Sequence, residues 1–423
     1  MNWGSLRDLF TGIAWKRLSA HEVDPAVSNG HEFQGARELR ALLGAEPLLD
    51  LPATYLLFGD DDGAPECVRA TASWYDARAR DPNRSQEWRL YYPREARAIQ
   101  ARMHPGDLVV IARFGTGSLA VLLAPQGSVR EAQLSALFGL DLGDAGKAHI
   151  QHFAKRDSIS FVAVTILEDL GLAAPEPVSG TTTDTAAQIA HELVGAYGSQ
   201  LPTGVAVAEL IQQRMPGEDA VADPDGALHR WIEAQAAVYR LWEDEIIRRR
   251  IQRGFLNPPG VPDVQAFRDF TMSLRQSRVS RAGAALQLHT ARILRANRVR
   301  FDEQVITENN ERPDFVFPGA AAYHDAAFPA ARLHMLAAKF TLKDRWRQVL
   351  NEAARIRHKH LLTMDGAVTA SGLTAMAASH LELVIPDIIR SAYPAKQRSG
   401  ISSVREFIAL LLERQITDAA VPL

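Results

Sequence analysis

The chain has 423 residues, about three times the ~150 of a typical domain, so we expect two or three folded units. Hydrophobic residues make up 47% and charged residues 23%, which excludes wholesale disorder. The formal charge is −3, which argues against nucleic-acid binding unless the basic residues are concentrated locally. No apolar run reaches the ~18 residues of a membrane span, and no basic leader precedes an apolar segment. We therefore expect a cytoplasmic protein without a membrane partner. The single cysteine, Cys67, excludes an internal disulfide and any cysteine-based metal site.

The first part of the chain predicts a mostly β unit. Three short apolar runs, each closed by Gly, Asp or Pro, have the length of strands, and they lie at 53–58, 108–112 and 119–123. One short helix is predicted over 37–43. Residues 173–187 read AAPEPVSGTTTDTAA, a composition typical of an exposed linker. This linker divides the chain into predicted domains at 1–172 and 188–423.

The second part predicts strands alternating with helices. Apolar residues follow helical spacing from Ala227 to Arg253, and the helix should end at Gly254. A break at 257–260 follows. The elements expected after it are a helix near 283–296, strands near 315–317 and 333–340, a helix over 343–358, a strand near 360–363, a helix, and a strand near 381–385. This alternation indicates an α/β fold whose sheet is covered by helices.

Arginines are concentrated in one part of this slightly acidic chain. Residues 275–300 hold seven arginines and no acid, and four more arginines lie at 248–253. Such a basic surface attracts a polyanion. The alternative is solvated helix faces paired with acids, and the lack of acids within the window argues against local pairing.

An acid and a lysine lie on two neighbouring predicted strands. Pro313 and Asp314 open the strand near 315–317, and Lys339 lies on the strand over 333–340. A carboxylate can hold a hard cation, which activates water and offsets phosphate charge, while an ammonium stabilises the developing anion. PD-(D/E)-x-K nucleases use this chemistry, but Ala337 occupies the position of their second acid. The alternative is a chance Pro-Asp pair and an ordinary strand lysine.

Glu352 is the candidate for the missing acid. It flanks an apolar stripe on the helix predicted over 343–358, so its carboxylate should face the edge of the sheet. The stripe consists of Trp346, Val349, Leu350, Ala353 and Ile356. Two neighbouring carboxylates repel each other and therefore favour a bound cation. The alternative is a surface glutamate that pairs with Arg355.

Three charged side chains at the start of the same helix, Lys343, Asp344 and Arg345, are candidates for reading DNA bases. Arginine suits the acceptor atoms of guanine, and aspartate can accept from cytosine. The alternative is a capping box formed by Thr341 and Asp344. We favour base readout because of the resemblance described next.

Residues 280–354 resemble the catalytic domain of the EcoRII restriction endonuclease family. The likeness is carried by SRAGAALQLH, ITENNERPDFVFPGAAAYHD and MLAAKFTLKDRWRQVLNEA, and it extends to LVIP and Tyr393-Pro394. The resemblance implies a restriction-endonuclease-like α/β domain with a mixed central sheet flanked by helices. It also implies a type IIE enzyme that uses Mg²⁺ to cut double-stranded DNA at a CCWGG-like site, leaving 5′ overhangs. A homodimer formed through the C-terminal domain and a cognate DNA methyltransferase in the same bacterial system are implied as well.

The resemblance assigns roles to individual residues. Asp314, Lys339 and Glu352 would be catalytic, with Asp314 and Glu352 binding the metal, and residues 343–345 would read the bases. Where the family has a further glutamate, this chain has Gln287, an additional candidate ligand that brings no charge. The number of metal ions therefore stays open.

The N-terminal part resembles the effector domain of the same family more faintly, around 16–20, 30–31 and 84–89. The resemblance implies a DNA-binding pseudobarrel that binds a second copy of the target and, when empty, blocks the catalytic cleft. The DNA contacts it implies are His31, Arg84, Glu87 and Arg89. Trp88 lies where the family is basic.

The sequence thus predicts a site-specific, magnesium-dependent DNA endonuclease with a regulatory DNA-binding domain. The alternative is a non-cleaving, sequence-specific DNA-binding regulator with a degenerate nuclease fold, which Ala337 and Gln287 favour. A nuclease without fixed sequence specificity is a third hypothesis.

Overall fold

The chain separates into two compact units, Asn2–Glu176 and Pro177–Leu423, and each is described by itself. The computed structural model describes residues 6–23, 27, 31–34, 36–59, 65–79, 83–96, 101–140, 142, 148–153, 163, 167, 181–198, 202–215, 219–258, 260–342, 346–391 and 393–419. The boundary between the units falls inside the segment predicted as a linker.

The predicted end of that linker at residue 187 is wrong. Helix α7 (Thr181–Tyr197) already begins at Thr181. Its side chains at Ala186, Ile189, Ala190 and Leu193 are buried at helical spacing, so the apolar face of the helix determines its conformation. The Thr-rich composition of 181–185 is typical of a linker, but the apolar face that follows it places these residues in a helix.

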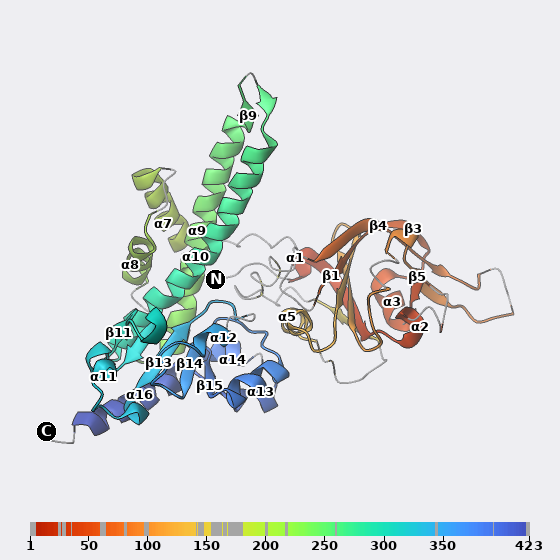
Figure 1. Cartoon of the computed structure of the whole chain (residues 1–423). Helices are drawn as coiled ribbons and strands as arrows, with labels where there is room; N and C mark the ends of the chain where they lie inside the picture. Colours follow the sequence, from red (N-terminus) through yellow and green to blue (C-terminus); the bar gives the residue numbers. More distant parts are fainter. Residues whose placement is uncertain are drawn as a thin grey trace. The chain divides into compact units, whose positions relative to one another are not determined.

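The N-terminal unit is built on one eight-stranded sheet with the strand order β2-β5-β4-β3-β7-β6-β1-β8 (Figure 1). The strands are β1 (Phe10–Arg17), β2 (Glu32–Phe33), β3 (Leu48–Leu57), β4 (Glu66–Asp76), β5 (Trp88–Tyr91), β6 (Leu108–Phe114), β7 (Leu119–Ala124) and β8 (His149–His152). Strands β3 and β7 run parallel, and the other neighbouring pairs are antiparallel. The three predicted strands fall on β3, β6 and β7.

Short helices accompany this sheet: α1 (Leu6–Leu9), α2 (Ala20–Val23), α3 (Ala36–Leu43), η1 (Arg94–Ala96) and α5 (Val129–Phe138). The predicted helix over 37–43 falls on α3. Strand β7 lies in the middle of the sheet and is buried at all six positions, which explains its unbroken apolar sequence. The core includes Tyr55 of β3, Trp74 of β4, Ile111 of β6 and Ala14 of β1, so the strands are held by side chains from both halves of the sheet.

The C-terminal unit begins with a helical layer. It contains α7, α8 (Gly204–Arg214), α9 (Pro224–Arg253) and α10 (Val264–Ala296), with a small hairpin of β9 (Leu256–Asn257) and β10 (Val261–Pro262) between the last two. Helices α9 and α10 lie side by side as a long pair with this hairpin at one end (Figure 1). His289 of α10 joins the layer, because its ring nitrogens contact the amides of Gln212 in α8 and Gln235 in α9 at 3.0 and 2.6 Å.

The predicted end of the first long helix at Gly254 is confirmed, since this glycine terminates α9 with φ 73°. The predicted start of the next helix near 283 is wrong. Helix α10 begins at Val264, directly after its N-cap Asp263, whose carboxylate accepts from the backbone N of Ala266 at 2.9 Å. Its first half is mostly exposed and polar, so the apolar spacing that marks a packed helix starts only later.

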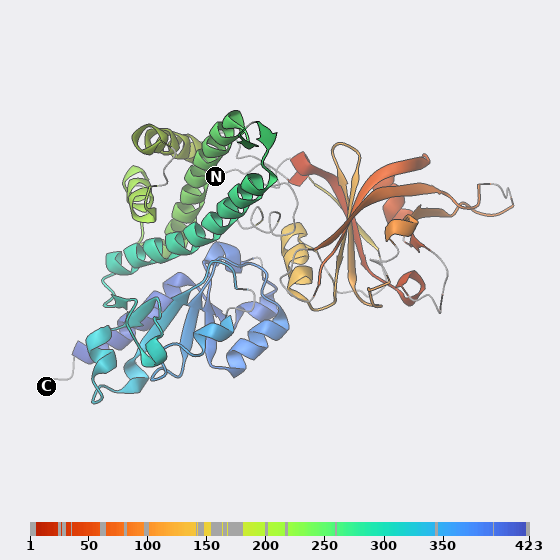
Figure 2. The same ribbon diagram turned by 45° about the horizontal axis from the view of Figure 1, so that its top comes forward.

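The second layer is a six-stranded sheet in chain order, β11-β12-β13-β14-β15-β16. The strands are β11 (Asp302–Glu303), β12 (Phe315–Phe317), β13 (His334–Ala338), β14 (Lys359–Leu362), β15 (Leu381–Val384) and β16 (Ile401–Ser402). Strands β11 to β13 pair antiparallel and β13 to β16 pair parallel, so the sheet is mixed, as predicted. Figure 2 shows α10 lying along this sheet.

The connections of this layer hold further short helices: η2 (Glu308–Asn310), α11 (Ala320–His324), η3 (Ala330–Arg332), α12 (Trp346–Val349), α13 (Ala370–Ala378), α14 (Asp387–Arg390), α15 (Ala395–Arg398) and the longer α16 (Val404–Ala419). Among the residues that the structure describes, no helix combines the length and the apolar character needed to cross a bilayer.

Strand register divides the side chains of the sheet between its two faces. Leu336 pairs with His360, which in turn pairs with Glu382, so these side chains point to one face. The His360 ring contacts Phe407 of α16 at 4.8 Å between centroids, so α16 covers this face. Residues one position away, including Ala337 and Lys359, point to the opposite face.

The helix predicted over 343–358 is wrong over most of its described length. Helix α12 spans only Trp346–Val349, and turns follow it. Ala353 has φ 48°, a left-handed conformation that costs a non-glycine residue ~1–2 kcal/mol and cannot continue a helix. Its backbone N donates to Thr307 Oγ1 at 3.4 Å, and its carbonyl accepts from Lys359 Nζ at 3.1 Å. Four apolar residues of the predicted stripe, Trp346, Val349, Ala353 and Ile356, are buried nevertheless, and Leu350 is half-buried. Their spacing therefore indicated burial and not a helix.

Candidate active site

Asp314 lies immediately before β12 and is 5% exposed. Its Oδ1 accepts from the side-chain amides of Gln287 at 2.6 Å and Gln304 at 2.9 Å. Its Oδ2 accepts from the backbone N of Ala338 at 2.7 Å and from Lys339 Nζ at 3.3 Å. Four donors from α10, from the loop around 304 and from β13 therefore fix the orientation of this carboxylate. The predicted acid and lysine do lie together.

Glu352 lies in the turn after α12, and not on a helix, and it is 7% exposed. Its Oε2 makes no hydrogen bond among the described residues, which omit 343–345. Burial raises the pKa of this carboxyl to about 7. Lys339 lowers this pKa and Asp314 raises it, so both charges lie near enough to act on Glu352. The structure thus brings Glu352 to the same site as Asp314 and Lys339, although by a different local conformation from the predicted one.

The alternative of a surface glutamate paired with Arg355 is wrong. The guanidinium of Arg355 instead donates to the backbone carbonyls of Asp325 and Phe328 at 3.0 and 2.9 Å. Arg355 therefore binds the connection after α11. Glu352 is buried and is not its partner.

Lys359, which the sequence analysis did not single out, supports the Glu352 turn. It is the first residue of β14, it is buried, and its Nζ donates to the backbone carbonyls of Glu352 and Ala353. Burial lowers the pKa of this ammonium, and Glu352 opposes that shift. A lysine at the start of a predicted buried strand was the available signal. It is weak because such lysines usually point to solvent.

A second support comes from the loop before β12. The backbone N of Ala354 donates to Glu308 Oε2 at 3.1 Å, next to the contact of Thr307 with Ala353. Residues 307–308 therefore hold the turn in place. They lie far from it in the sequence, so local sequence patterns could not predict these contacts.

The oxygen atoms at this site are suitable ligands for a hard divalent cation. Two carboxylates, on Asp314 and Glu352, belong to one buried site, and Glu352 Oε2 has no hydrogen-bond donor in the described structure. Buried carboxylate oxygens without donors are costly unless a proton or a cation neutralises them. Gln287 donates its amide N to Asp314, so in this orientation it positions that carboxylate, and turning the amide over would present its oxygen.

The predicted base-reading residues Lys343, Asp344 and Arg345 lie outside the described residues. The alternative interpretation, in which the arginines of the basic window pair with acids, holds for three of them. Arg278 and Arg281 pair with Glu243 of α9 at 2.6 and 2.7 Å, and Arg295 pairs with Glu303 of β11. The acids come from other elements, so the sequence window did not contain them.

The predicted effector residues lie around β2 and β5. His31 is half-buried, with its ring 5.6 Å from that of Tyr91. Arg89 pairs with Glu87 at 2.5 Å, and its hydrogen bond lowers the pKa of that carboxyl. Arg84 is exposed. Two of the four predicted contact residues, Glu87 and Arg89, are therefore paired with each other.

Trp88 does not replace a phosphate contact. It is 6% exposed and packs against Trp74, with 5.3 Å between ring centroids. This residue is therefore part of the hydrophobic core of the N-terminal unit.

Part of the chain is similar to known proteins. Residues 239–408 match the family model described as EcoRII C terminal. Over 190 residues the chain is 38% identical to the type II restriction enzyme EcoRII of Escherichia coli, and this alignment covers 45% of this chain and 46% of that protein. The chain thus matches about half the length of this curated relative.

Two solved structures are also similar. Metal-depleted Ecl18kI in complex with uncleaved, modified DNA is 18% identical with a TM-score of 0.44, covering 56% of this chain and 87% of that chain. The PspGI–substrate DNA complex is 13% identical with a TM-score of 0.42, covering 51% and 94%. The segment that matches the EcoRII C-terminal family model contains Asp314, Lys339 and Glu352.

Proposed function

We propose that this protein is a type II site-specific endonuclease that hydrolyses phosphodiester bonds of double-stranded DNA with the help of Mg²⁺. The observation that carries the proposal is the convergence of Asp314, Lys339 and Glu352 in one site, within the segment that matches the EcoRII C-terminal family. An acid pair that holds a cation beside a lysine is an arrangement that phosphodiester hydrolysis can use.

Asp314 and Glu352 would hold the cation. When bound, Mg²⁺ would lower the pKa of its water and offset charge on the phosphate. Lys339 has a side chain that is 25% exposed, and its ammonium lies 3.3 Å from Asp314 Oδ2, so it can turn toward a phosphate oxygen without leaving the site. Gln287 and Gln304 would keep Asp314 oriented throughout. Glu352 would have to lose its proton before binding a cation, because its pKa lies near neutrality.

The finer features follow from the resemblance to the EcoRII family. We propose cleavage at a CCWGG-like sequence with 5′ overhangs, base readout by Lys343, Asp344 and Arg345, and a homodimer formed through the C-terminal unit. A cognate DNA methyltransferase in the same bacterial cytoplasm would protect the host's own sites.

The N-terminal unit would act as an effector domain. We propose a DNA-binding pseudobarrel that takes a second copy of the target through His31, Arg84, Glu87 and Arg89. Its single eight-stranded sheet supports this proposal, as does the exposure of Arg84. Because Glu87 and Arg89 are paired with each other, DNA would have to replace part of that pairing.

A non-cleaving regulator is the second candidate function. Gln287 favours it, because an amide that donates to Asp314 occupies the place of a family acid. Ala337 favours it as well. It lies where PD-(D/E)-x-K nucleases have their second acid, and its buried methyl group offers no ligand atom.

A plasmid assay separates these functions. The purified full chain is incubated with a plasmid carrying CCWGG sites, with Mg²⁺ or with EDTA, and with a matched plasmid lacking the sites. Discrete Mg²⁺-dependent fragments from the first plasmid alone would support the proposal, and the sequenced ends would define the cleavage position. A smear from both plasmids would indicate a nuclease without fixed specificity, and specific binding without cleavage would indicate the regulator.

A further inference from the structure

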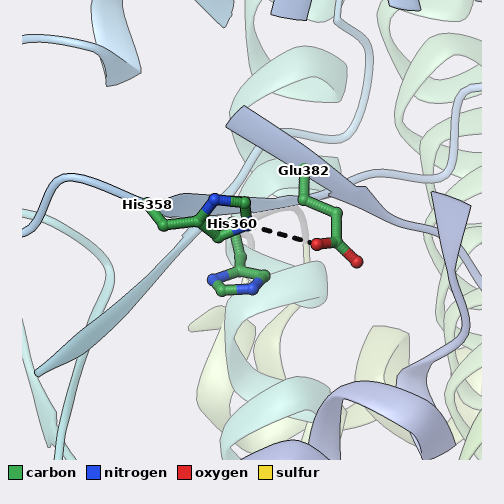
Figure 3. Close-up of side chains that lie close together, drawn as sticks. All are labelled: His358, His360 and Glu382. Atoms are coloured by element: carbon green, nitrogen blue, oxygen red, sulfur yellow. Dashed lines mark hydrogen bonds and ion pairs between the residues drawn. The ribbon is translucent and has the colours of Figure 1, made fainter. Parts of the chain in front are cut away.

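A cluster of metal-binding side chains lies on the other face of the C-terminal sheet. His358, His360 and Glu382 each offer a ligand atom, and these atoms all lie within 4.8 Å of one another (Figure 3). His360 and Glu382 are paired residues on the adjacent strands β14 and β15. By strand alternation, Lys339 and Lys359 point to the opposite face, so the cluster is separate from the candidate active site.

His360 is the buried member of the cluster. It is 1% exposed, and neither of its ring nitrogens makes a hydrogen bond of normal geometry among the described residues. Buried ring nitrogens without well-formed hydrogen bonds are costly, and a metal ligand bond would reduce that cost.

The other two members make the cluster accessible. The His358 and Glu382 side chains are 54% and 33% exposed, and His358 Nε2 lies 3.2 Å from Glu382 Oε2. The other carboxylate oxygen of Glu382 accepts from Ser402 Oγ, which orients the carboxylate. Both residues line a cavity of about 540 Å³, which gives an ion a route to the cluster.

One of the two arginines at this cavity is paired with acids. Arg390 pairs with Glu406 at 2.6 Å and with Asp387 at 2.8 Å. Arg398, also at the cavity, donates its Nε to the carbonyl of Tyr393 at 2.7 Å and keeps its charge.

We propose that His358, His360 and Glu382 bind Zn²⁺, with a fourth position open toward the cavity. Two imidazoles and one carboxylate are a common ligand set of zinc, whereas Mg²⁺ prefers oxygen ligands alone. Ligand atoms around tetrahedral zinc lie about 3.3 Å apart, given bonds of about 2.0 Å. The half-exposed side chains of His358 and Glu382 have the freedom to close that difference. The ion would link β14 to β15 and is independent of the proposed nuclease activity.

The test measures zinc binding by the full chain after dialysis against EDTA and then against buffer. It uses Asp314→Asn protein, so that the carboxylates of the candidate active site do not supply a second site. We expect about one zinc per chain and a higher thermal unfolding midpoint with zinc. Adding His358→Gln or Glu382→Gln should weaken binding about tenfold or more. His324→Gln, at an exposed histidine of α11, is the matched control and should bind like its parent.

Cobalt(II) provides a second readout that does not depend on stability. Bound at the cluster, it should give the visible absorption of a four-coordinate site with nitrogen ligands, and His358→Gln should abolish that absorption. Absence of zinc binding in the Asp314→Asn protein would overturn the proposal. Binding that survives both His358→Gln and Glu382→Gln would overturn it as well.

Discussion

Glu352 is a buried carboxyl whose environment favours its protonated form. Burial is the main reason that its pKa lies at about 7, and neighbouring acids add to the shift. Burying an unpaired carboxylate at this position costs free energy, and a bound cation would offset that cost. A residue that destabilises the metal-free protein is better explained by function than by folding.

The first prediction concerns metal-free stability and pH. The folded-state pKa of Glu352 lies above its ordinary value of 4.5, so folded protein holds this proton more tightly than unfolded protein. Its contribution to stability is therefore present below about pH 4.5 and is lost as pH rises through about 7. In EDTA at pH 8, Glu352→Gln should raise the free energy of unfolding by about 2 kcal/mol, and at pH 4.5 the difference should vanish. Urea unfolding of both proteins at both pH values measures this. Equal stabilities at pH 8 would contradict the assigned burial.

The second prediction concerns Gln287. Gln287→Glu removes a donor from Asp314 and places a third carboxylate at the site. We expect the metal-free protein to lose about 1–3 kcal/mol of stability, because a donor is replaced by a like charge. The Mg²⁺ concentration that gives half-maximal cleavage should fall severalfold, since the site then offers more negative charge to the cation.

Gln276→Glu is the matched control for that variant, because it makes the same change at an exposed position of α10. It should change neither the stability nor the Mg²⁺ requirement. A Gln287→Glu protein with an unchanged or higher Mg²⁺ requirement would show that Gln287 lies outside the metal's reach.

At the scale of elements, the sequence predicted the positions of strands correctly, but it predicted the wrong conformation for the segment that carries Glu352. Strand β12 was predicted at its observed bounds, because a short apolar run between polar residues has few other interpretations. The turn after α12 was predicted as helix, because its apolar residues have helical spacing. What bends it is Ala353, held by Thr307 and Lys359, and these contacts join residues far apart in the chain. Local patterns do not contain such information.

The third prediction belongs to this turn. Lys359→Met keeps the length of the side chain but leaves the carbonyls of Glu352 and Ala353 without their donor. We expect a loss of about 1–3 kcal/mol of stability, faster amide exchange across 350–358, and cleavage reduced more than DNA binding. Hydrogen–deuterium exchange and cleavage rates measure these effects.

Lys396→Met, at an exposed lysine of α15, is the control and should behave as the unchanged protein. Unaltered exchange across the turn in Lys359→Met would show that Lys359 does not hold Glu352 in place.

At the scale of the molecule, composition alone was a poor guide to function. The formal charge of −3 argued against nucleic acid, and only the distribution of arginines and the family-like segments pointed to it. The structure shows why that distribution is a limited signal, since Arg278 and Arg281 are paired with Glu243. The division into two units was predictable from the Pro- and Thr-rich segment, whereas the role of the N-terminal unit rests on faint likeness.

The fourth prediction concerns that unit. If it is an effector domain, a plasmid with one target site should be cut slowly, and adding a short duplex that carries the site should accelerate cleavage of the plasmid. A duplex with a scrambled sequence is the control. Gel electrophoresis of time courses measures the rates. Equal rates with the two duplexes would exclude activation by a second specific DNA copy.

The central claim is that Asp314, Lys339 and Glu352 form a hydrolytic centre. The most direct measurement compares Lys339→Ala with the unchanged protein in single-turnover cleavage of a target duplex in Mg²⁺, alongside binding of the same duplex in Ca²⁺. If Lys339 stabilises charge at the scissile phosphate as proposed, cleavage should fall by about 10²–10³-fold while specific binding persists. Lys396→Ala should retain both. Cleavage by Lys339→Ala at the unchanged rate would contradict the account.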